Sequence, residues 1–589
     1  MNRLVRRVAV IAALLTGLFF APAALAQPRQ LLMPGVTYER QVQFTNRGPV
    51  VYHVLTAPRP GGLYSFREAL AGGVIQGRAT VTSMQRAVSG AATVAGVNGD
   101  LFNWTDGHPT GVVIRDGVLD HTPSPDRSSI GIDGDGTLHV DRVTMFGTWQ
   151  GSGQRRVLSG VNEPPPANGF SLYTPSWGPA TPALPGSFEV VVTPLPPTVP
   201  NTEISGPVAQ TSQNGNTPIP VGGAVLVARG DAAAKLAGEA LISQTVTIRL
   251  LLRPDWSTIT QALGGGPVIV KDGKAVFRAY ELFTPDQLLP HNPRTAVGQR
   301  ADGKIVMLVV DGRQPGYSVG MTNFELAQAM VRLGCVTASA LDSGGSSTMA
   351  FDGQLLNQPS DDTGERAVKE ALLVYYTGVY APPASAPVVS PNGDGVAERQ
   401  QLSYKLVRPS TVTARLVGPD GTAYYEDSGL KNPGVYKVTW PSTTQRRSVL
   451  PQGRWQWVVQ AFDDQGQRSS VDRGFTVNNT LGYLRPDPRA LAVPRLKPRA
   501  IASVDVTQAA GILAWIESAS GAPIVNVATG RVARGQLVLR WDGRGGTGSA
   551  VYPGSYVLRV VASNGFGRVE LDAKIRVVRA RFKVLPPPR

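Results

Sequence analysis

The stretch that decides the fold runs from His291 to Met349 and reads HNPRTAVGQRADGKIVMLVVDGRQPGYSVGMTNFELAQAMVRLGCVTASALDSGGSSTM. Residues 305–310 are a continuous apolar run rich in β-branched side chains, which is typical of a strand buried on both faces. Residues 335–341 read as a second buried strand. Each run ends in a polar turn, the first at Asp311 and the second at Asp342.

A helix is predicted between these two strands. Thr322 and Glu325 have the spacing of a capping box, in which each side chain satisfies a free backbone N–H. Gly334 suits the left-handed position that ends a helix. Apolar residues recur between these limits at helical spacing: Phe324, Ala327, Met330 and Val331. The stretch is therefore predicted to be a strand–helix–strand unit.

The turns after the two strands predict a ligand site. If the strands are parallel, a right-handed crossover places both turns at one end of the sheet, where open α/β sheets bind ligands. The glycines in the second turn let backbone N–H groups approach an oxyanion closely. Carboxylates, an arginine and an amide-rich loop suit a substrate that carries a sugar and a phosphate: Asp311, Arg313, Asp342, Ser343, Gly344, Gly345 and Ser346.

The simpler alternative is that these residues only form turns, since Asp, Ser and Gly are common in turns. Either turn alone favours that interpretation. Two such turns at successive strand ends, with arginines in the same stretch, favour a site.

The composition indicates a large, β-rich chain. The 589 residues suggest three or four domains, and 66 glycines and 48 prolines indicate many turns. Cys335 is the only cysteine, so no intramolecular disulfide can form. It falls at the start of a predicted buried strand, where a small apolar thiol is common. A catalytic role is not favoured, because no base that could activate the thiol can be identified.

The N-terminus has the features of a secretory signal over residues 1–26. Three arginines precede an apolar core at 8–21, and Ala24-Leu25-Ala26 has the pattern of a cleavage site. A membrane anchor is the alternative, but the apolar core is short and no other segment is long and apolar enough to span a bilayer. We therefore expect a secreted protein of the extracellular space or the cell envelope, in the periplasm or at the cell surface.

The formal net charge of +15 at pH 7 favours anionic partners such as envelope polymers or phospholipid surfaces. Solubility alone would also explain it. Nucleic acid is set aside, because the chain has no recognisable nucleic-acid-binding motif and no dense Lys/Arg helix.

Further polar residues follow an apolar strand that begins at Thr93. Asn98 and Asp100 lie at its end, and His108 lies in the loop beyond. Taken singly, each is more simply a turn or loop residue. Ser129 to Val143 reads as a hairpin, residues 160–220 as a long irregular insertion, and residues 371–376 as the last strand before an Ala/Pro/Ser linker at 381–389.

The rest of the chain has the pattern of short alternating strands. Residues 390–480 and 501–580 share an internal pattern of strands and turns, and a Pro/Arg-rich linker at 481–500 separates them. This pattern predicts two all-β sandwiches after a first domain at 27–380.

Several motifs together resemble the phosphodiester glycosidase domain family. In chain order they are Asn98 to Phe102 (NGDLF), Gly264 to Pro267 (GGGP), Arg294 to Gly298 (RTAVG), Asp311 to Arg313 (DGR), Leu341 to Ser347 (LDSGGSS) and Glu365-Arg366. The resemblance covers roughly residues 30–380. Ser343 departs from it, since the family usually has glycine there.

The resemblance implies an α/β (mixed α+β) domain that cleaves the bond between a sugar anomeric carbon and a phosphodiester oxygen. Arginines would hold the phosphate by bidentate pairing, and an aspartate would act as a base or stabilise an oxocarbenium-like state. The expected catalytic residues are Asp342, Asp311, Arg294 and Asp100. The expected substrate-binding residues are Asn98, Arg313, Ser343, Gly344, Gly345, Ser346, Arg366, Thr295 and His108.

No cofactor is required by this chemistry, and no metal ligands are assigned. A divalent cation such as calcium is compatible with the aspartates, but their spacing does not demand one.

The two C-terminal segments resemble the immunoglobulin-like domain of flagellar hook-capping proteins. Ser390 to Gly395 (SPNGDG) and the pattern from Trp541 to Tyr556 carry this likeness, which implies spacing or surface attachment. We therefore expect a secreted hydrolase of sugar-1-phosphodiesters, acting on a phosphorylated glycan of the bacterial envelope or an extracellular glycopolymer. The alternatives are an ordinary glycosidase or phosphodiesterase on the same scaffold, and a non-catalytic glycopolymer-binding or adhesion protein.

Overall fold

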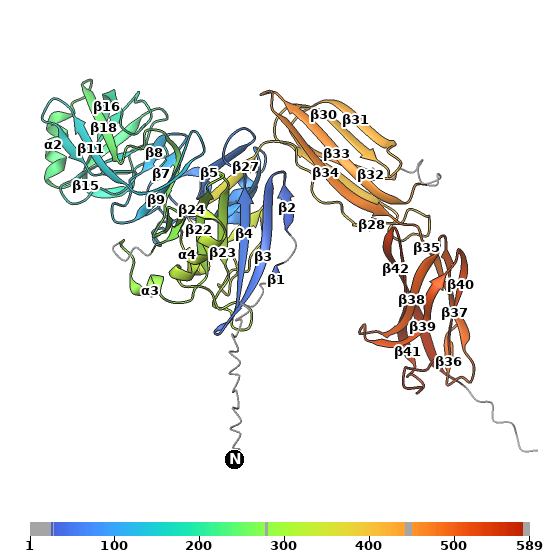
Figure 1. Ribbon diagram of the computed structural model, residues 1–589. Helices are drawn as coiled ribbons and strands as arrows, with labels where there is room; N and C mark the ends of the chain where they lie inside the picture. Colours follow the sequence, from blue (N-terminus) through green and yellow to red (C-terminus); the bar gives the residue numbers. More distant parts are fainter. Residues whose placement is uncertain (1–24, 27–28, 277–280, 442–449, 581–589) are drawn as a thin grey trace, which may run out of the picture. The chain divides into compact units, whose positions relative to one another are not determined.

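The computed structural model describes residues 25–26, 29–276, 281–441 and 450–580 (Figure 1). Strands make up 53% of it and helices 7%, so the chain is mostly β and has less helix than an α/β fold implies. Residues 1–24 of the predicted signal segment lie outside the described residues. The chain divides into two compact units, the first ending at Tyr375 and the second made of residues 376 onward with the short segment 90–93.

The first unit is built around a nine-stranded sheet in the order β1-β3-β4-β23-β22-β24-β20-β21, with β2 paired to β3. Its strands are β1 (Leu25–Ala26), β2 (Gln30–Met33), β3 (Val36–Thr45), β4 (Gly48–Ala57), β20 (Val268–Lys271), β21 (Lys274–Ala275), β22 (Arg294–Arg300), β23 (Ile305–Val310) and β24 (Cys335–Ala340). All six residues of β23 are buried, as its unbroken apolar sequence predicts.

The strand–helix–strand unit has parallel outer strands, as the crossover argument requires. β22 is antiparallel to both β23 and β24 and lies between them. The ends of β23 and β24 and the start of β22 therefore meet at one end of the sheet. No local sequence pattern indicates that β22 lies between β23 and β24.

Helix α4 (Asn323–Arg332) connects β23 to β24 and has the predicted capping box of Thr322 and Glu325. Its apolar face differs from the predicted one. Phe324 is 50% exposed, whereas Met330 is fully buried. The other helix residues in the core are Leu326, Ala327 and Ala329.

A second sheet of the first unit has the order β26-β25-β6-β27-β5. Its strands are β5 (Tyr64–Leu70), β6 (Thr93–Asn98), β25 (Met349–Phe351), β26 (Gln354–Leu355) and β27 (Glu370–Tyr376), with α1 (Val81–Val88) packed on β25. Every residue of β6 is buried. The end of β6 contacts the loop after β24. Asn98 N donates to Thr348 O, and Asp342 N donates to Gly99 O.

Two more sheets complete the first unit, in the orders β10-β9-β19-β7-β8 and β12-β11-β18-β16-β15-β17-β14-β13. The former contains β7 (Val113–Arg115), β8 (Val118–His121), β9 (Ser128–Asp133), β10 (Leu138–Arg142) and β19 (Ile259–Gly264). The latter contains β11 (Thr144–Gln150), β12 (Arg156–Leu158), β13 (Gly160–Val161), β14 (Phe170–Tyr173), β15 (Ala183–Val192), β16 (Glu203–Gly215), β17 (Ala224–Ala228) and β18 (Thr245–Arg253).

The predicted irregular insertion at 160–220 is wrong, because this segment supplies four strands of the eight-stranded sheet. The alternation of buried and exposed residues in the first half of β16 explains why it pairs despite its glycine and proline. Helix α2 (Asp231–Glu239) follows β17, and the short α3 (Pro285–Leu288) precedes β22.

The second unit contains two all-β regions, each with its own buried core. The first consists of the sheet β28-β34-β33-β30-β31 and the pair β29-β32. These strands are β28 (Val388–Val389), β29 (Gln400–Leu406), β30 (Ser410–Val417), β31 (Ala423–Lys431), β32 (Gly434–Trp440), β33 (Gly453–Asp463) and β34 (Arg468–Val477).

The second all-β region consists of the sheets β35-β37-β40 and β36-β42-β41-β38-β39. These strands are β35 (Leu481–Pro486), β36 (Leu491–Val493), β37 (Arg499–Val506), β38 (Ala510–Ser518), β39 (Pro523–Val532), β40 (Gly535–Trp541), β41 (Gly554–Asn564) and β42 (Gly567–Arg579). The immunoglobulin-like assignment of both regions stays a prediction. Within the described residues, no helix has the length and apolar character needed to cross a membrane.

The two faces of α4 give a matched test of the core. Met330→Ala should lower the free energy of unfolding by about 2–4 kcal/mol, because it leaves a cavity against the central sheet. Phe324→Ala should change it by less than about 0.5 kcal/mol, since half of that side chain is already in solvent. Urea denaturation followed by circular dichroism measures both. Equal losses in the two variants would contradict this packing.

Candidate active site

A small cleft lies where β22 begins and β24 ends. Its volume is about 90 Å³, and four of the predicted residues line it: Asp100, Arg294, Asp342 and Ser343. The cleft is also lined, on the side of α3, by Phe283, Gln287 and Leu288, and just before β20 by Gly266 and Pro267. The loops after β6 and β24 thus reach the same cleft from different sheets.

Asn98 is the residue that joins these loops. Its carboxamide oxygen accepts hydrogen bonds from Thr295 Oγ1 at 2.8 Å and from Thr348 N at 3.1 Å. Its Nδ2 donates to the carbonyls of Gly99 and Asp342 at 3.2 and 3.0 Å. The side chain is fully buried, so its polar atoms serve the protein itself. This arrangement favours a positioning role over the expected contact with a sugar.

Asp100 forms a bidentate ion pair with an arginine that the sequence analysis did not identify. Arg127 donates to its two carboxylate oxygens at 2.8 and 2.9 Å, and both residues are buried. The Asp100 backbone N–H donates to Glu370 Oε1 at 2.9 Å. A buried pair with this geometry is held firmly, because removal of one partner would leave the other charge uncompensated.

Asp342 has the environment of an acid–base group. It is partly buried, and its Oδ1 accepts the Ser343 N–H at 2.8 Å. Burial raises the pKa of the Asp342 carboxyl to about 6, although the Ser346 side chain and the Ser343 N–H act in the opposite direction. The nearby negative charge of Asp100 also raises this pKa, and Arg366 lowers it. A carboxyl that titrates near neutral pH in a cleft suits proton transfer.

Asp311 is fully engaged by the protein. Its Oδ2 is hydrogen-bonded to His53 Nε2 and Tyr317 OH, both at 2.9 Å. Its Oδ1 accepts from Asn357 Nδ2 at 3.0 Å and from the Gln358 N–H at 3.1 Å. Asn357 also binds the Ser347 carbonyl and the Met349 N–H, so Asp311 anchors the loop after β24. The Asp311 carboxylate is buried, and Asp311 is not among the described residues that line the cleft.

Arg294 is likewise committed, since its guanidinium donates to backbone carbonyls. Nε binds Met321 O at 2.9 Å, Nη1 binds Gln287 O at 2.6 Å, and Nη2 binds Pro290 O at 2.8 Å. Burial lowers the pKa of Arg294 to about 10. These bonds fasten the α3 segment to the end of the sheet. They leave the fork of the guanidinium unavailable for the expected bidentate contact with a phosphate.

The glycine pair after Asp342 is packed against two other arginines. A Cβ on Gly344 would lie 3.1 Å from the Arg313 terminal nitrogens, and one on Gly345 would lie 2.1 Å from Arg366 Nη2. Arg313 is exposed and is held through Nε by Asn292 at 3.0 Å. Arg366 pairs with Asp361 at 2.7 and 2.9 Å. Glycine is needed here because any side chain would displace these guanidiniums.

The remaining predicted residues lie at different depths. Thr295 is fully buried beneath the cleft and donates to Asn98. Ser346 is buried and accepts from Arg366 Nη1 at 3.4 Å. His108 lies in the loop after β6, where its Nδ1 is 2.5 Å from Asp106 Oδ1, and it is not among the described residues that line the cleft.

A buried pair of glutamates behind Asp100 also escaped the sequence analysis. Burial raises the pKa of the Glu370 carboxyl to about 7, and a side-chain hydrogen bond with Glu68 acts in the opposite direction. Burial also raises the pKa of Glu68 well above its usual range, and Glu370 adds to this effect. The two carboxyls belong to neighbouring strands, β5 and β27. No local motif marks them, because only the pairing of these strands brings them together.

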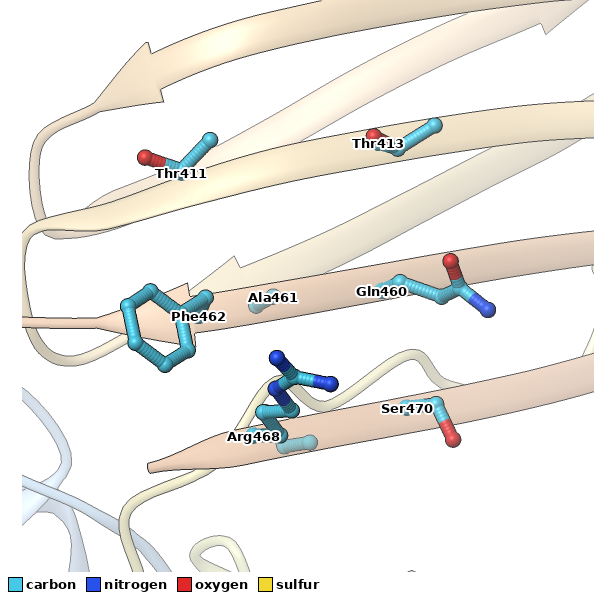
Figure 2. Close-up of a pocket in the computed structure, with 8 residues that line it drawn as sticks. Thr411, Thr413, Gln460, Ala461, Phe462, Arg468 and Ser470 are labelled. Carbon is cyan, nitrogen blue, oxygen red and sulfur yellow. The ribbon is translucent and has the colours of Figure 1, made fainter. Parts of the chain in front are cut away.

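A larger depression lies on the second unit (Figure 2). It is open, has a volume of about 520 Å³ and is lined by Thr411, Thr413, Gln460, Ala461, Phe462, Arg468, Ser469 and Ser470. Its lining includes no carboxylate among the described residues, so it cannot supply the acid–base groups of a hydrolase. Nor do the described residues contain a group of three or more His, Cys, Asp or Glu side chains placed to hold a metal ion.

Comparison with known proteins identifies the domain. Residues 200–375 match the family model described as phosphodiester glycosidase. The chain carries a phosphodiester glycosidase domain. The matched segment contains Arg294, Asp311, Arg313, Asp342 and Arg366, whereas Asn98 and Asp100 precede it.

Two curated proteins share short segments with this chain. An uncharacterized protein derived from the SPbeta prophage of Bacillus subtilis (strain 168) is 40% identical over 108 residues, which are 18% of this chain and 16% of that protein. The N-acetylglucosamine-1-phosphodiester alpha-N-acetylglucosaminidase of Bos taurus is 38% identical over 68 residues, which are 12% of each chain. The matches therefore span less than a fifth of either relative.

A solved structure shares the fold. The crystal structure of a hypothetical protein from Synechocystis superposes with a TM-score of 0.50 at 24% sequence identity, covering 59% of this chain and 64% of that one. At this identity the likeness concerns the fold alone.

The buried glutamate pair makes a prediction about stability and pH. A raised Glu370 pKa means that the folded state keeps a proton that the unfolded chain loses, so its contribution to stability is present below about pH 4.5 and is lost as the pH rises through about 7. Glu370→Gln should remove this loss, so at pH 8 the free energy of unfolding of the variant should exceed that of the parent protein by about 2–3 kcal/mol more than it does at pH 4.5.

Urea denaturation at several pH values measures this difference. The control is Glu203→Gln, which changes an exposed carboxylate paired with Arg155 on the surface. A parallel pH dependence in Glu370→Gln and the parent protein would contradict a titrating pair in the core.

Proposed function

We propose that this protein hydrolyses sugar-1-phosphodiesters at the bond between the anomeric carbon and the phosphodiester oxygen, and that it acts on exported bacterial glycopolymers. The observation that carries the proposal is the cleft of the phosphodiester glycosidase domain, where Asp342, with a pKa raised to about 6, stands beside the Asp100–Arg127 pair. The secretory features of residues 1–26 support the exported location.

The residues divide the chemistry as follows. The Asp342 carboxylate takes the proton of the water whose oxygen bonds to the anomeric carbon, while the bond from that carbon to the phosphodiester oxygen breaks. The phosphate monoester leaves with the bonding electron pair. Arg313, beside Gly344, holds its negative charge, and Arg366, which Asp361 fixes beside Gly345, adds electrostatic attraction.

The other expected residues position this machinery. Asp311 and Asn98 fix the loop that carries Asp342, and Arg294 fixes the α3 segment opposite it. Asp100 presents its carboxylate toward the cleft under the restraint of Arg127, where it can bind sugar hydroxyls or stabilise positive charge on the sugar ring.

Hydrolysis in water enriched in oxygen-18 tests the bond that is cleaved. Cleavage at the anomeric carbon places the label on the sugar, whereas a phosphodiesterase places it on the phosphate. Mass spectrometry of the two products distinguishes these results. Label on the phosphate would refute the proposal.

Asp342→Asn tests the base. It should lower kcat by about 10²–10⁴-fold, because the amide cannot accept the proton of water. In the parent protein kcat/KM should rise with pH through about 6, as the Asp342 carboxyl loses its proton. Asp302→Asn is the control, since Asp302 is an exposed aspartate in the β22–β23 turn. Retained turnover in Asp342→Asn would exclude Asp342 as the base.

The depression on the second unit favours a second candidate function, glycopolymer binding. Cross-strand pairing places Thr411, Phe462 and Arg468 in one row and Thr413, Gln460 and Ser470 in the next (Figure 2). Phe462 is 47% exposed, and Arg468 lies 5.7 Å from its ring centroid. An exposed ring surrounded by hydroxyl and amide groups suits a sugar chain.

Phe462→Ala should weaken binding of a soluble anionic polysaccharide by about tenfold, because the apolar platform is lost. Isothermal titration calorimetry of the full chain, with Asp342→Asn also present to prevent turnover, measures the change. Leu513→Ala, an exposed apolar residue of β38, is the control. Equal affinities in the two variants would remove the support for binding at this face.

A further inference from the structure

An exposed tryptophan stands beside Arg366, one of the two arginines of the proposed site. Trp104 lies in the loop after β6 and is 62% exposed. The guanidinium carbon of Arg366 is 5.3 Å from its ring centroid, and that of Arg78 is 5.5 Å away. The Phe102 ring is 5.2 Å from the same indole. We call Arg78, Phe102, Trp104 and Arg366 the Trp104 cluster.

The two arginines of the Trp104 cluster differ in charge balance. Arg366 is paired with Asp361. Arg78 is exposed, and among the residues that the structure describes no carboxylate forms an ion pair with it. Its positive charge is thus available to a ligand, and its position is restrained by contact with the rings of Phe102 and Trp104.

The backbone holds Arg78 at this place. Gly77 N donates to Asp106 O at 2.9 Å, which ties the segment before α1 to the loop after β6. Gly107 has a φ of +77°, and a Cβ there would lie 2.9 Å from Arg78 Cγ. The loop is therefore closely packed against the aliphatic part of Arg78, which fixes the direction in which the side chain leaves the surface.

The Trp104 cluster adjoins the loop after β24, which forms one wall of the cleft. Arg366 donates to Ser346 Oγ and lies against Gly345, two positions from Ser343 at the cleft wall. Arg366 and Arg78 both contact the Trp104 indole, so a substrate chain that extends past Arg366 would have the indole and the Arg78 guanidinium within reach. An indole face packs on a sugar ring, and a guanidinium binds a phosphate in a bidentate manner.

We propose that Trp104 and Arg78 form a subsite for the leaving group that binds the next sugar and the next phosphate of the substrate. This inference rests on the proposed function and narrows it. The preferred substrate is a repeating sugar-phosphate chain, with a negative charge beyond the cleaved bond, and not a diester of a neutral alcohol.

Two substrates test the subsite. One is a sugar-1-phosphate methyl ester, which ends at the cleaved diester, and the other is an oligomer of three sugar-phosphate repeats of the same sugar. In the parent protein kcat/KM should be at least about tenfold higher for the oligomer at low salt, and this ratio should fall as salt screens the added contact. Arg78→Ala should lower the ratio about tenfold, and Trp104→Ala should lower it as well.

The control is Arg67→Ala. Arg67 also lies over an aromatic ring, with its guanidinium carbon 5.9 Å from the Tyr375 centroid, so this variant removes the same charge and the same kind of contact elsewhere on the unit. Arg67→Ala should leave the ratio unchanged. An equal effect of Arg67→Ala and Arg78→Ala, or a ratio near one in the parent protein, would overturn the subsite.

The two hypotheses fail in different ways. Turnover of both substrates with a ratio near one rejects the subsite and keeps the proposed function. No turnover of either substrate rejects the proposed function. In that case the oligomer affinity of the parent protein and of Arg78→Ala, measured by titration calorimetry, decides the subsite: a tenfold loss supports it, and equal affinities overturn it.

Discussion

The carboxamide of Asn98 is the interaction on which the cleft depends. It makes four hydrogen bonds, two as acceptor and two as donor, to three separate parts of the chain: the end of β6, the start of β22 and the loop after β24. A buried amide with all its bonds made specifies one geometry, since any shift of a segment would leave a polar atom without a partner at a cost of about 1–3 kcal/mol. Two sheets are thereby joined at the point where the acidic loop must be placed.

Three other buried side chains around the cleft follow the same logic. Arg294 is surrounded by carbonyls, Asp311 by hydrogen-bond donors, and Asp100 by a matching guanidinium. Each is satisfied within the protein and therefore fixed in place. Asp342 differs, because it is only partly buried and burial shifts its pKa toward neutrality. Asp342 is therefore the carboxyl of the cleft that is best suited to proton transfer, because the protein does not satisfy all of its hydrogen-bonding capacity.

Local pattern predicted the parts of this fold that local forces determine. The buried run of β23, the capping box of α4 and the polar turns at Asp311 and Asp342 were all readable, because strand burial and helix capping involve neighbours in sequence. The insertion of β22 between two parallel strands was not, since strand order depends on long-range pairing. The strands within 160–220 were missed because frequent proline and glycine obscured an alternating pattern.

The site was predictable only in part for a related reason. Residue type suggested Arg294 as a phosphate ligand, but its hydrogen-bond partners are carbonyls from a helix and loop that only the fold brings near. Arg127 and Glu370 carry no motif, and their roles arise from contacts with Asp100 across long stretches of chain.

Strand pairing also has a consequence for any shortened form of the protein. The segment recognised by the family model begins at residue 200, yet β23 is hydrogen-bonded along its whole length to β4, and β25 is paired with β6. Excision at residue 200 would remove neighbouring strands from two sheets and expose the backbone edges of buried strands, which favours aggregation. The evolutionary unit that sequence comparison detects is thus smaller than the physical unit that can fold.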